Sequence, residues 1–280
     1  MKFGFVTCVQ LGLDCLDELC KCGAEVSLAV TLHNDLAPKK SGRIYLDHFC
    51  AEHSIPLIKT KNVNEDHIIK AIRTADIDRL FIVGWSQIAG RAVLDAPNLG
   101  VLGMHPSLLP EGRGRAAIPW AILKGLTVTG VTLFRMDEGV DTGVILHQVK
   151  IPIEDREDAG SLYAKVCAAH REAIRYSYPC LKSWGAVYIK QDESRATVWP
   201  QRKPEDGRIN PTMTVTEIDR LVRAVTRPYP GAFIERDKSS VIIWAGHPDK
   251  NTDTRSGYRI TASDGIYVAS EFEFVYQEKK

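Results

Sequence analysis

The 280-residue sequence predicts an α/β protein whose larger part is a doubly wound parallel sheet (Rossmann-like). Short apolar runs with glycine close behind, such as residues 80–84, are typical of buried parallel strands. Segments with apolar residues at helical spacing alternate with these runs over the first two thirds of the chain, as expected for an α/β fold. After residue 207, short strand-like runs separated by turns predict a small β-barrel-like domain.

The first strand is predicted at 3–7 and the second at 26–31, with a helix between them whose apolar residues recur every three or four positions. A short strand–helix–strand crossover favours a right-handed parallel unit. The first strand-to-helix turn lacks GxGxxG, so a dinucleotide site has little support. Further helices are predicted at 44–53, 66–74, 91–94, 119–123 and 158–182. Further strands are predicted at 55–58, 77–83, 101–104, 127–134 and 144–149.

Residues 191–207, rich in charged residues, glutamine and proline, are predicted to be a linker. The predicted domains are therefore 1–190 and 208–280. In the second domain we expect a helix at 216–225, a constrained proline-containing turn at 227–233, and strands at 241–245, 258–262 and 265–270.

The composition is that of an ordinary soluble globular protein, with 44% hydrophobic and 25% charged residues. A net charge of +1 argues against a generally basic nucleic-acid binder. Seven cysteines without paired CxxC spacing indicate reduced thiols and a cytoplasmic location. The sequence shows no signal-peptide pattern and no apolar run near the roughly 20 residues of a membrane helix, and its histidines show no metal-binding spacing. We therefore expect no membrane partner and no metal.

The segment 105–115 holds the first candidate catalytic residue, His105, directly after the predicted strand 101–104. In an open α/β sheet the ligand crevice lies beyond the carboxyl ends of the strands. Two prolines and two glycines after His105 cannot form a regular helix or strand, so a long functional loop is expected. A second candidate, Asp141, lies in a tight acidic turn at 137–143. A histidine beside a carboxylate is suited to acid–base work near neutral pH.

Three motifs together resemble the folate-dependent formyltransferase family. They are His-Pro-Ser-Leu-Leu-Pro followed by Arg-Gly at 105–114, Thr-Gly-Val-Thr at 129–132, and Asp-Thr-Gly-Val-Ile at 141–145. His105 and Asp141 stand 36 positions apart, similar to the family's catalytic spacing. One position departs from the family, which usually has Asn two residues before the histidine, where this chain has Gly103. The segment 222–233 is similar to the family's C-terminal domain, most closely the type that formylates an amino-arabinose nucleotide.

The resemblance implies a catalytic pair, His105 and Asp141, and 10-formyltetrahydrofolate as cosubstrate. By the same resemblance, the folate-binding residues are Gln87, Ile88, Ala89, Arg115, Asp137, Glu138, Gly139 and Val140. Thr7, Gln10 and Arg113 are candidates for substrate contact, Thr7 and Gln10 being the weaker ones. Arg113 and Arg115 either decorate the loop surface or meet an anionic group. A basic, polar loop at 34–43 is either solvated or faces a phosphate.

Three functions compete. The first is an N-formyltransferase acting on the amino deoxysugar of a nucleotide sugar, as in surface polysaccharide biosynthesis. The second is a methionyl-tRNA formyltransferase, and the third is a formyltransferase-like binding module without activity. A tRNA enzyme needs a basic surface, whereas residues 201–280 carry acidic and basic residues in similar numbers. The sequence therefore favours a small nucleotide-sugar substrate over nucleic acid. A homodimer is expected as one option.

Overall fold

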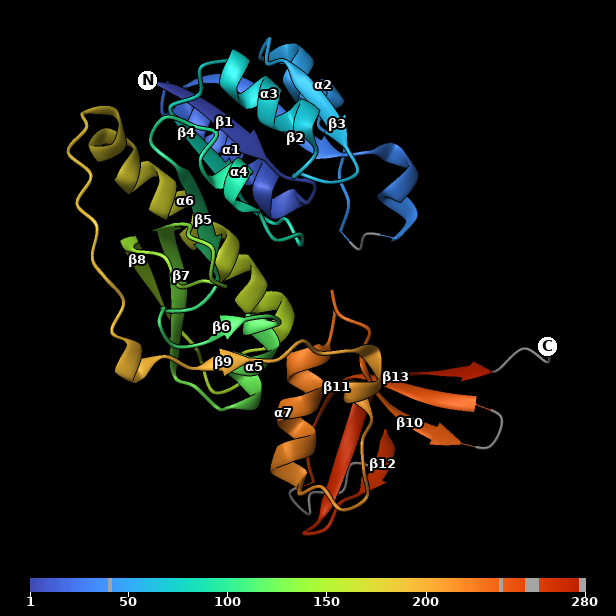
Figure 1. Cartoon of the computed structure of the whole chain (residues 1–280). Helices are drawn as coiled ribbons and strands as arrows, with labels where there is room; N and C mark the ends of the chain where they lie inside the picture. The colour runs from blue at the N-terminus through green and yellow to red at the C-terminus, as the bar shows by residue number, and fades with distance from the viewer. Residues whose placement is uncertain (40–41, 237–238, 250–256, 277–280) are drawn as a thin grey trace. The chain divides into compact units, whose positions relative to one another are not determined.

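The computed structural model describes residues 1–39, 42–236, 239–249 and 257–276 (Figure 1). The α-helices are α1 Gln10–Lys21, α2 Asp47–Glu52, α3 Asp66–Thr74, α4 Arg91–Leu94, α5 Ala117–Leu123, α6 Ala159–Lys182 and α7 Val215–Val225. Three short 3₁₀ helices are η1 Asn34–Lys39, η2 Glu193–Arg195 and η3 Pro204–Gly207. The strands are β1 Lys2–Val6, β2 Glu25–Leu32, β3 Leu57–Thr60, β4 Arg79–Ile82, β5 Val101–His105, β6 Arg113–Gly114, β7 Val128–Arg135, β8 Ile145–Pro152, β9 Val198–Trp199, β10 Ala232–Arg236, β11 Ser239–Pro248, β12 Tyr258–Thr261 and β13 Ile266–Tyr276.

The main sheet has seven strands in the order β3-β2-β1-β4-β5-β7-β8. Strands β1 to β5 pair in parallel, and β7 runs antiparallel to β5. Sheets of this mixed kind are common among doubly wound folds. The predicted Rossmann-like fold is confirmed, and the antiparallel pairing adds a consequence for the site. It brings Thr132 of β7 directly opposite His105 at the end of β5.

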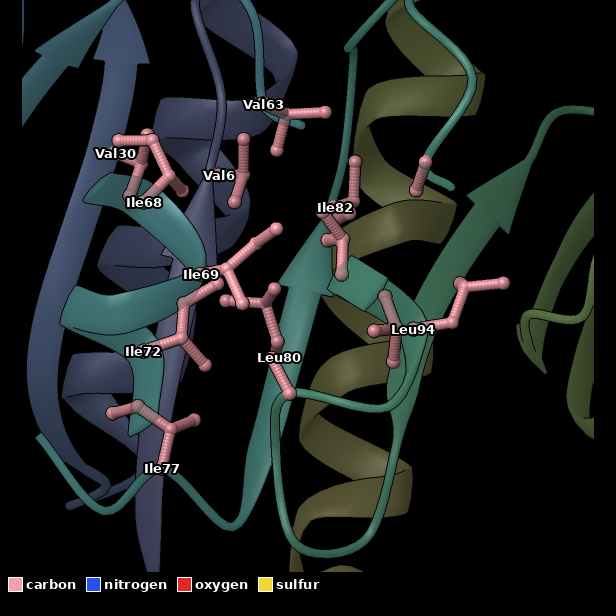
Figure 2. Packing of buried hydrophobic residues seen from close by; sticks show 14 of the residues in the cluster. Val6, Val30, Val63, Ile68, Ile69, Ile72, Ile77, Leu80, Ile82 and Leu94 are labelled. Atoms are coloured by element: carbon pink, nitrogen blue, oxygen red, sulfur yellow. The ribbon is translucent and has the colours of Figure 1, made fainter. Parts of the chain in front are cut away.

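Successive side chains of β1 point to opposite faces of the sheet, and both faces are buried. Val6 joins an aliphatic core with Ile68, Ile69 and Ile72 of α3 (Figure 2). On the other face, Phe3 packs against the ring of Tyr178 from α6, with ring centroids 6.0 Å apart. Helices therefore cover both faces, which leaves the strand ends as the place where polar side chains gather.

The C-terminal strands form a four-stranded antiparallel sheet in the order β10-β11-β13-β12, a curled half-barrel that confirms the expected small β-rich domain. The sequence did not predict β10, which begins at Ala232 inside the segment interpreted as a constrained turn. Helix α7 opens with a capping box between Thr214 and Glu217.

Contacts between residues divide the chain into two compact units. The first comprises Met1–Arg113, Gly130–Lys150 and Val166–Val198, and the second Gly114–Thr129, Ile151–Lys165 and Trp199–Lys280. The boundaries at 190 and 208 remain a prediction, and the predicted linker contains η2, β9 and η3. The predicted basic loop at 34–43 includes η1, and its Lys40 and Ser41 lie outside the described residues.

Candidate active site

His105 is the last residue of β5, and its side chain is almost fully buried. Its Nε2 atom lies 2.7 Å from the carbonyl oxygen of Gly112. Because a carbonyl oxygen only accepts hydrogen bonds, Nε2 is the protonated nitrogen in this arrangement. The loop after His105 is fixed by Thr132, whose hydroxyl donates to the carbonyl of Ser107 at 2.7 Å and accepts from the amide of Leu109 at 3.1 Å.

Asp141 lies beside His105, as the spacing of the motifs implied. Its Oδ2 atom is 3.5 Å from Nδ1 of His105, and the two side chains are 18% and 9% exposed. Nδ1 of His105 faces this carboxylate, so a proton on Nδ1 would be donated to Asp141. The structure therefore brings a proton donor and a proton acceptor together at the carboxyl end of the sheet.

The acidic turn that carries Asp141 is tightly constrained. Asp137 accepts hydrogen bonds from the backbone amide of Gly139 at 3.0 Å and from the Thr142 hydroxyl at 2.5 Å. A Cβ atom at Gly143 would lie 1.7 Å from the carbonyl oxygen of Arg135, so only glycine fits there. The turn places Asp141 in the left-handed region, with φ at 57°.

A cavity of about 310 Å³ adjoins this turn. Its lining includes Asp137 and Glu138 from the turn, Met136, and Arg91 at the start of α4. Arg91 lies 3.8 Å from a carboxylate oxygen of Glu138 and 2.6 Å from one of Asp95. The volume falls within the range of small-ligand sites, and the lining supplies both donors and acceptors. Of the residues that the resemblance assigns to folate, Asp137 and Glu138 line this cavity.

The other folate candidates have structural partners. The Gln87 amide accepts from the backbone amide of Val63 at 3.0 Å and donates to the carbonyl of Lys61 at 2.7 Å. Ala89 is buried, and the side chain of Ile88 is 69% exposed. A residue that the sequence did not single out, Asn64, donates to the carbonyl of Ile88 at 2.9 Å and accepts from Gly90 at 2.7 Å. The loops after β3 and β4 are thus tied together.

Two further folate candidates lie in the acidic turn at 137–143. A Cβ atom at Gly139 would be 2.0 Å from the Thr142 hydroxyl, and Val140 is 54% exposed. Arg115 belongs to the second compact unit, where it donates to Gln201 at 3.2 Å. The roles given to these residues by resemblance stay predictions.

The three predicted substrate contacts differ in what surrounds them. Thr7 is fully buried at the end of β1, where a Cβ atom at Gly12 would clash with its hydroxyl. Gln10 is exposed at the start of α1 and donates to Asp14 at 2.7 Å. Arg113 is buried and pairs with Gln191 and Glu193 within its own unit. The roles of these three residues in substrate binding stay predictions.

Gly103, where the family usually has Asn, faces side chains that fill the space beside it. A Cβ atom there would lie 2.9 Å from Cγ of Met136 and 3.1 Å from its sulfur, and also 3.1 Å from Cζ of Phe134. A thioether cannot donate a hydrogen bond. Apolar side chains therefore fill the space beside position 103, where the family's Asn would place a polar amide.

Among the described residues, no group of three or more His, Cys, Asp or Glu side chains is placed to hold a metal ion. Over the same part of the chain, no helix combines the length and apolar character that a membrane span requires. The seven cysteines, all in described segments, form no disulfide.

Sequence profiles of two domains match the chain. The profile described as formyl transferase covers residues 14–176, and that of the formyl transferase C-terminal domain covers residues 202–276. The chain belongs to the formyltransferase family. This confirms the resemblance to folate-dependent formyltransferases, and His105 and Asp141 lie within the matched residues 14–176.

Solved structures share the fold at low sequence identity. WlaRD, a sugar 3N-formyltransferase crystallised with dTDP and 5-N-formyltetrahydrofolate, is similar over 100% of this chain and 99% of its own, with 17% identity and a TM-score of 0.70. Methionyl-tRNA formyltransferase from Clostridium thermocellum is similar over 99% of this chain and 100% of its own, with 19% identity and a TM-score of 0.63. HypX from Aquifex aeolicus, in complex with tetrahydrofolic acid, is similar over 97% of this chain, which spans only 44% of HypX, with 19% identity and a TM-score of 0.70.

Proposed function

We propose that this protein transfers a formyl group from 10-formyltetrahydrofolate to the primary amine of a nucleotide-linked amino deoxysugar. The observation that carries the proposal is the 3.5 Å approach of His105 Nδ1 and Asp141 Oδ2 at the carboxyl end of the sheet. Family membership supports a formyl group as the transferred group, and the largely buried pair supports the proton chemistry that the transfer needs.

The reaction forms one carbon–nitrogen bond and breaks another. The unprotonated amine attacks the formyl carbon, and the carbonyl oxygen becomes an oxyanion in the tetrahedral intermediate. Asp141 accepts the proton that the attacking nitrogen loses. His105, protonated on both nitrogens, stabilises the oxyanion and donates a proton to the leaving folate nitrogen. Asp141 then passes the proton it accepted to His105, which restores the pair. The net result moves one proton from the amine to the folate.

The cavity beside the acidic turn supports a folate donor. A pterin is flat and carries several donors and acceptors, and the lining of this cavity offers carboxylates at Asp137 and Glu138 and a guanidinium at Arg91. Met136 and Leu94 supply apolar contact in the same cavity. This mixture suits a heteroaromatic ring better than a fully charged ligand.

The charge of the C-terminal part favours a small acceptor over tRNA. Phosphate contacts dominate affinity for nucleic acid, and a tRNA-binding domain therefore needs an excess of basic residues. Residues 201–280 hold basic and acidic residues in similar numbers. Likeness over nearly the whole length of WlaRD, crystallised with dTDP, supports a nucleotide-linked sugar. A cytoplasmic location, a homodimer and a place in surface polysaccharide synthesis are parts of the same proposal.

The test is an assay of purified protein with 10-formyltetrahydrofolate and a panel of amino-sugar nucleotides, with charged initiator tRNA in parallel. We expect one formyl group on the sugar nitrogen by mass spectrometry, and poor turnover of the sugar without its nucleotide, since remote binding energy positions the amine. Formylation of methionyl-tRNA without turnover of any amino-sugar nucleotide would instead identify a tRNA enzyme. Folate binding without turnover of either class would identify a binding module.

A further inference from the structure

Gln191, in the segment after α6, contacts the backbone of the turn that holds Asp141. Its Nε2 atom donates to the carbonyl oxygen of Asp141 at 2.8 Å and to that of Gly143 at 2.7 Å. One amide group therefore bridges two carbonyls of the turn. Gln191 lies 50 positions from Asp141 and 48 from Gly143 in the sequence, so these contacts form only in the folded chain.

Arg113 fixes the orientation of that amide. Its Nε and Nη2 atoms donate to Oε1 of Gln191 at 3.1 and 2.7 Å. Arginine has only donors, so Oε1 must face it and Nε2 must face the turn. Arg113 is buried and is itself held by Glu193, with contacts of 2.9 and 2.6 Å. The acceptor of the Gln191 amide thus faces Arg113 and its donor faces the turn, so only one orientation of the amide satisfies both sets of hydrogen bonds.

The same segment also supports the His105 side of the pair. Thr197 accepts from the amide of Gly112 through its hydroxyl at 2.8 Å, and its carbonyl accepts from the amide of Arg113 at 2.9 Å. The carbonyl of Gly112 is the group that contacts Nε2 of His105. Residues 191–197, which we call the strap, therefore hold the backbone next to both members of the pair. Figure 1 shows this part of the chain between α6 and β9.

Backbone geometry at Asp141 explains why such support is needed. A non-glycine residue with φ near 57° is uncommon, and it persists only where surrounding contacts fix it. Without the two hydrogen bonds from Gln191, the turn could relax toward more usual angles. The carboxylate would then move away from Nδ1 of His105.

We propose that Gln191 is a positioning residue that holds Asp141 at its catalytic distance from His105, with Arg113 setting the direction of the Gln191 amide. The inference rests on the proposed function for its effect on turnover. It also reinterprets Arg113, which the sequence offered as a substrate contact, as part of the support of the turn. Gln191 reaches the catalytic pair through the backbone of the turn and has no contact with the reacting atoms in this assignment.

Gln191→Glu is the sharpest variant, because it preserves the size of the side chain and an acceptor for Arg113 but removes both donors to the turn. We expect kcat to fall roughly 10- to 100-fold, the scale of a misplaced catalytic group, while KM stays within about threefold. Gln191→Leu removes both the acceptor for Arg113 and the donors to the turn, and it should lower kcat at least as much. Arg195→Gln is the control on the same strap, since it breaks only an exposed ion pair with Glu111 and should keep kcat.

A crystal structure of Gln191→Glu without ligands gives a readout that does not depend on the acceptor. We expect the separation of His105 Nδ1 and Asp141 Oδ2 to exceed the 3.5 Å of the wild type. An unchanged Asp141 position together with wild-type kcat would overturn the proposal. If the wild-type protein turned over no acceptor, the proposed function would fail, and the crystal structure alone would still decide whether Gln191 positions Asp141.

Discussion

At the scale of single residues, the proposed chemistry depends on one imidazole with acceptors at both nitrogens. His105 has the carbonyl of Gly112 on one side and Asp141 on the other. His105→Asn should lower kcat by roughly 10²–10⁴, the usual effect of losing a general acid–base group. The measurement is steady-state turnover of the identified amino-sugar nucleotide.

A histidine outside the pair provides the control for that variant. His147 in β8 stacks on Tyr176, with ring centroids 4.1 Å apart, so His147→Asn also removes a partly buried imidazole from the first unit. This variant should retain near wild-type kcat. Equal activity in His105→Asn and His147→Asn would exclude His105 from the mechanism.

The missing family Asn leads to a prediction about packing. Gly103→Asn forces a side chain into the space that Met136 occupies, where even a Cβ atom would lie 2.9 Å from Cγ. Overpacking of this kind should reduce the free energy of unfolding by about 1–3 kcal/mol, measured by urea denaturation. Kcat should also fall, because the displaced Met136 lines the cavity beside the turn.

The double variant Gly103→Asn/Met136→Ala tests the cause. If Met136 is the obstacle, the double variant should be more stable than the sum of the two single changes predicts, because contacting residues are not additive. Strict additivity would mean that the strain arises elsewhere. A rate increase in Gly103→Asn alone would show that position 103 has room for an amide.

At the scale of elements, the helices and strands predicted correctly are those whose local sequence pattern is clear. The bounds predicted for α3, 66–74, match the structure because its three inward isoleucines recur at helical spacing. Strand β10 was missed because proline and glycine just before it are strong turn signals. His105 and Asp141 were found together because each lies in a recognisable motif. Gln191 and Asn64 lie in polar segments, and only long-range contacts reveal what they hold.

The N-terminus of α7 offers a test of a single element. Thr214 accepts from the backbone amide of Glu217 at 3.2 Å, and Glu217 accepts from the amide of Thr214 at 2.7 Å. Thr214→Ala should cost about 1 kcal/mol of unfolding free energy at neutral pH, measured by urea denaturation. Thr214→Ser should keep most of the stability. Thr216→Ala makes the same chemical change at an exposed position two residues later and should be close to neutral.

The capping contribution should also depend on pH. Hydrogen bonds from the backbone and side chain of Thr214 lower the pKa of Glu217 below its ordinary value of 4.5. A depressed pKa in the folded state gives stability that is present above the ordinary value and is lost as pH falls through the lowered one. The difference between wild type and Thr214→Ala should therefore shrink under acid conditions. A constant difference down to that range would contradict the reciprocal capping box.

At the scale of the whole molecule, one buried base should link folding to pH. His170 of α6 is completely buried, and its Nδ1 atom lies 2.8 Å from the carbonyl of Val166. Burial lowers the pKa of His170 from 6.5 to about 4, the hydrogen bond to Val166 opposes this shift, and repulsion from His105 adds to it. The folded chain therefore keeps His170 neutral over a pH range in which the unfolded chain protonates it.

The sign follows from proton binding. Between pH 6.5 and about 4 the unfolded state binds more protons at His170 than the folded state, so stability falls as pH falls. The loss at this site should be on the order of 3 kcal/mol across that range. His170→Gln cannot titrate, so it should lose less unfolding free energy than the wild type between pH 7 and pH about 4 in urea denaturation. Parallel losses in both proteins would show that other groups cause the acid sensitivity, and that His170 is protonated as readily in the folded chain as in the unfolded one.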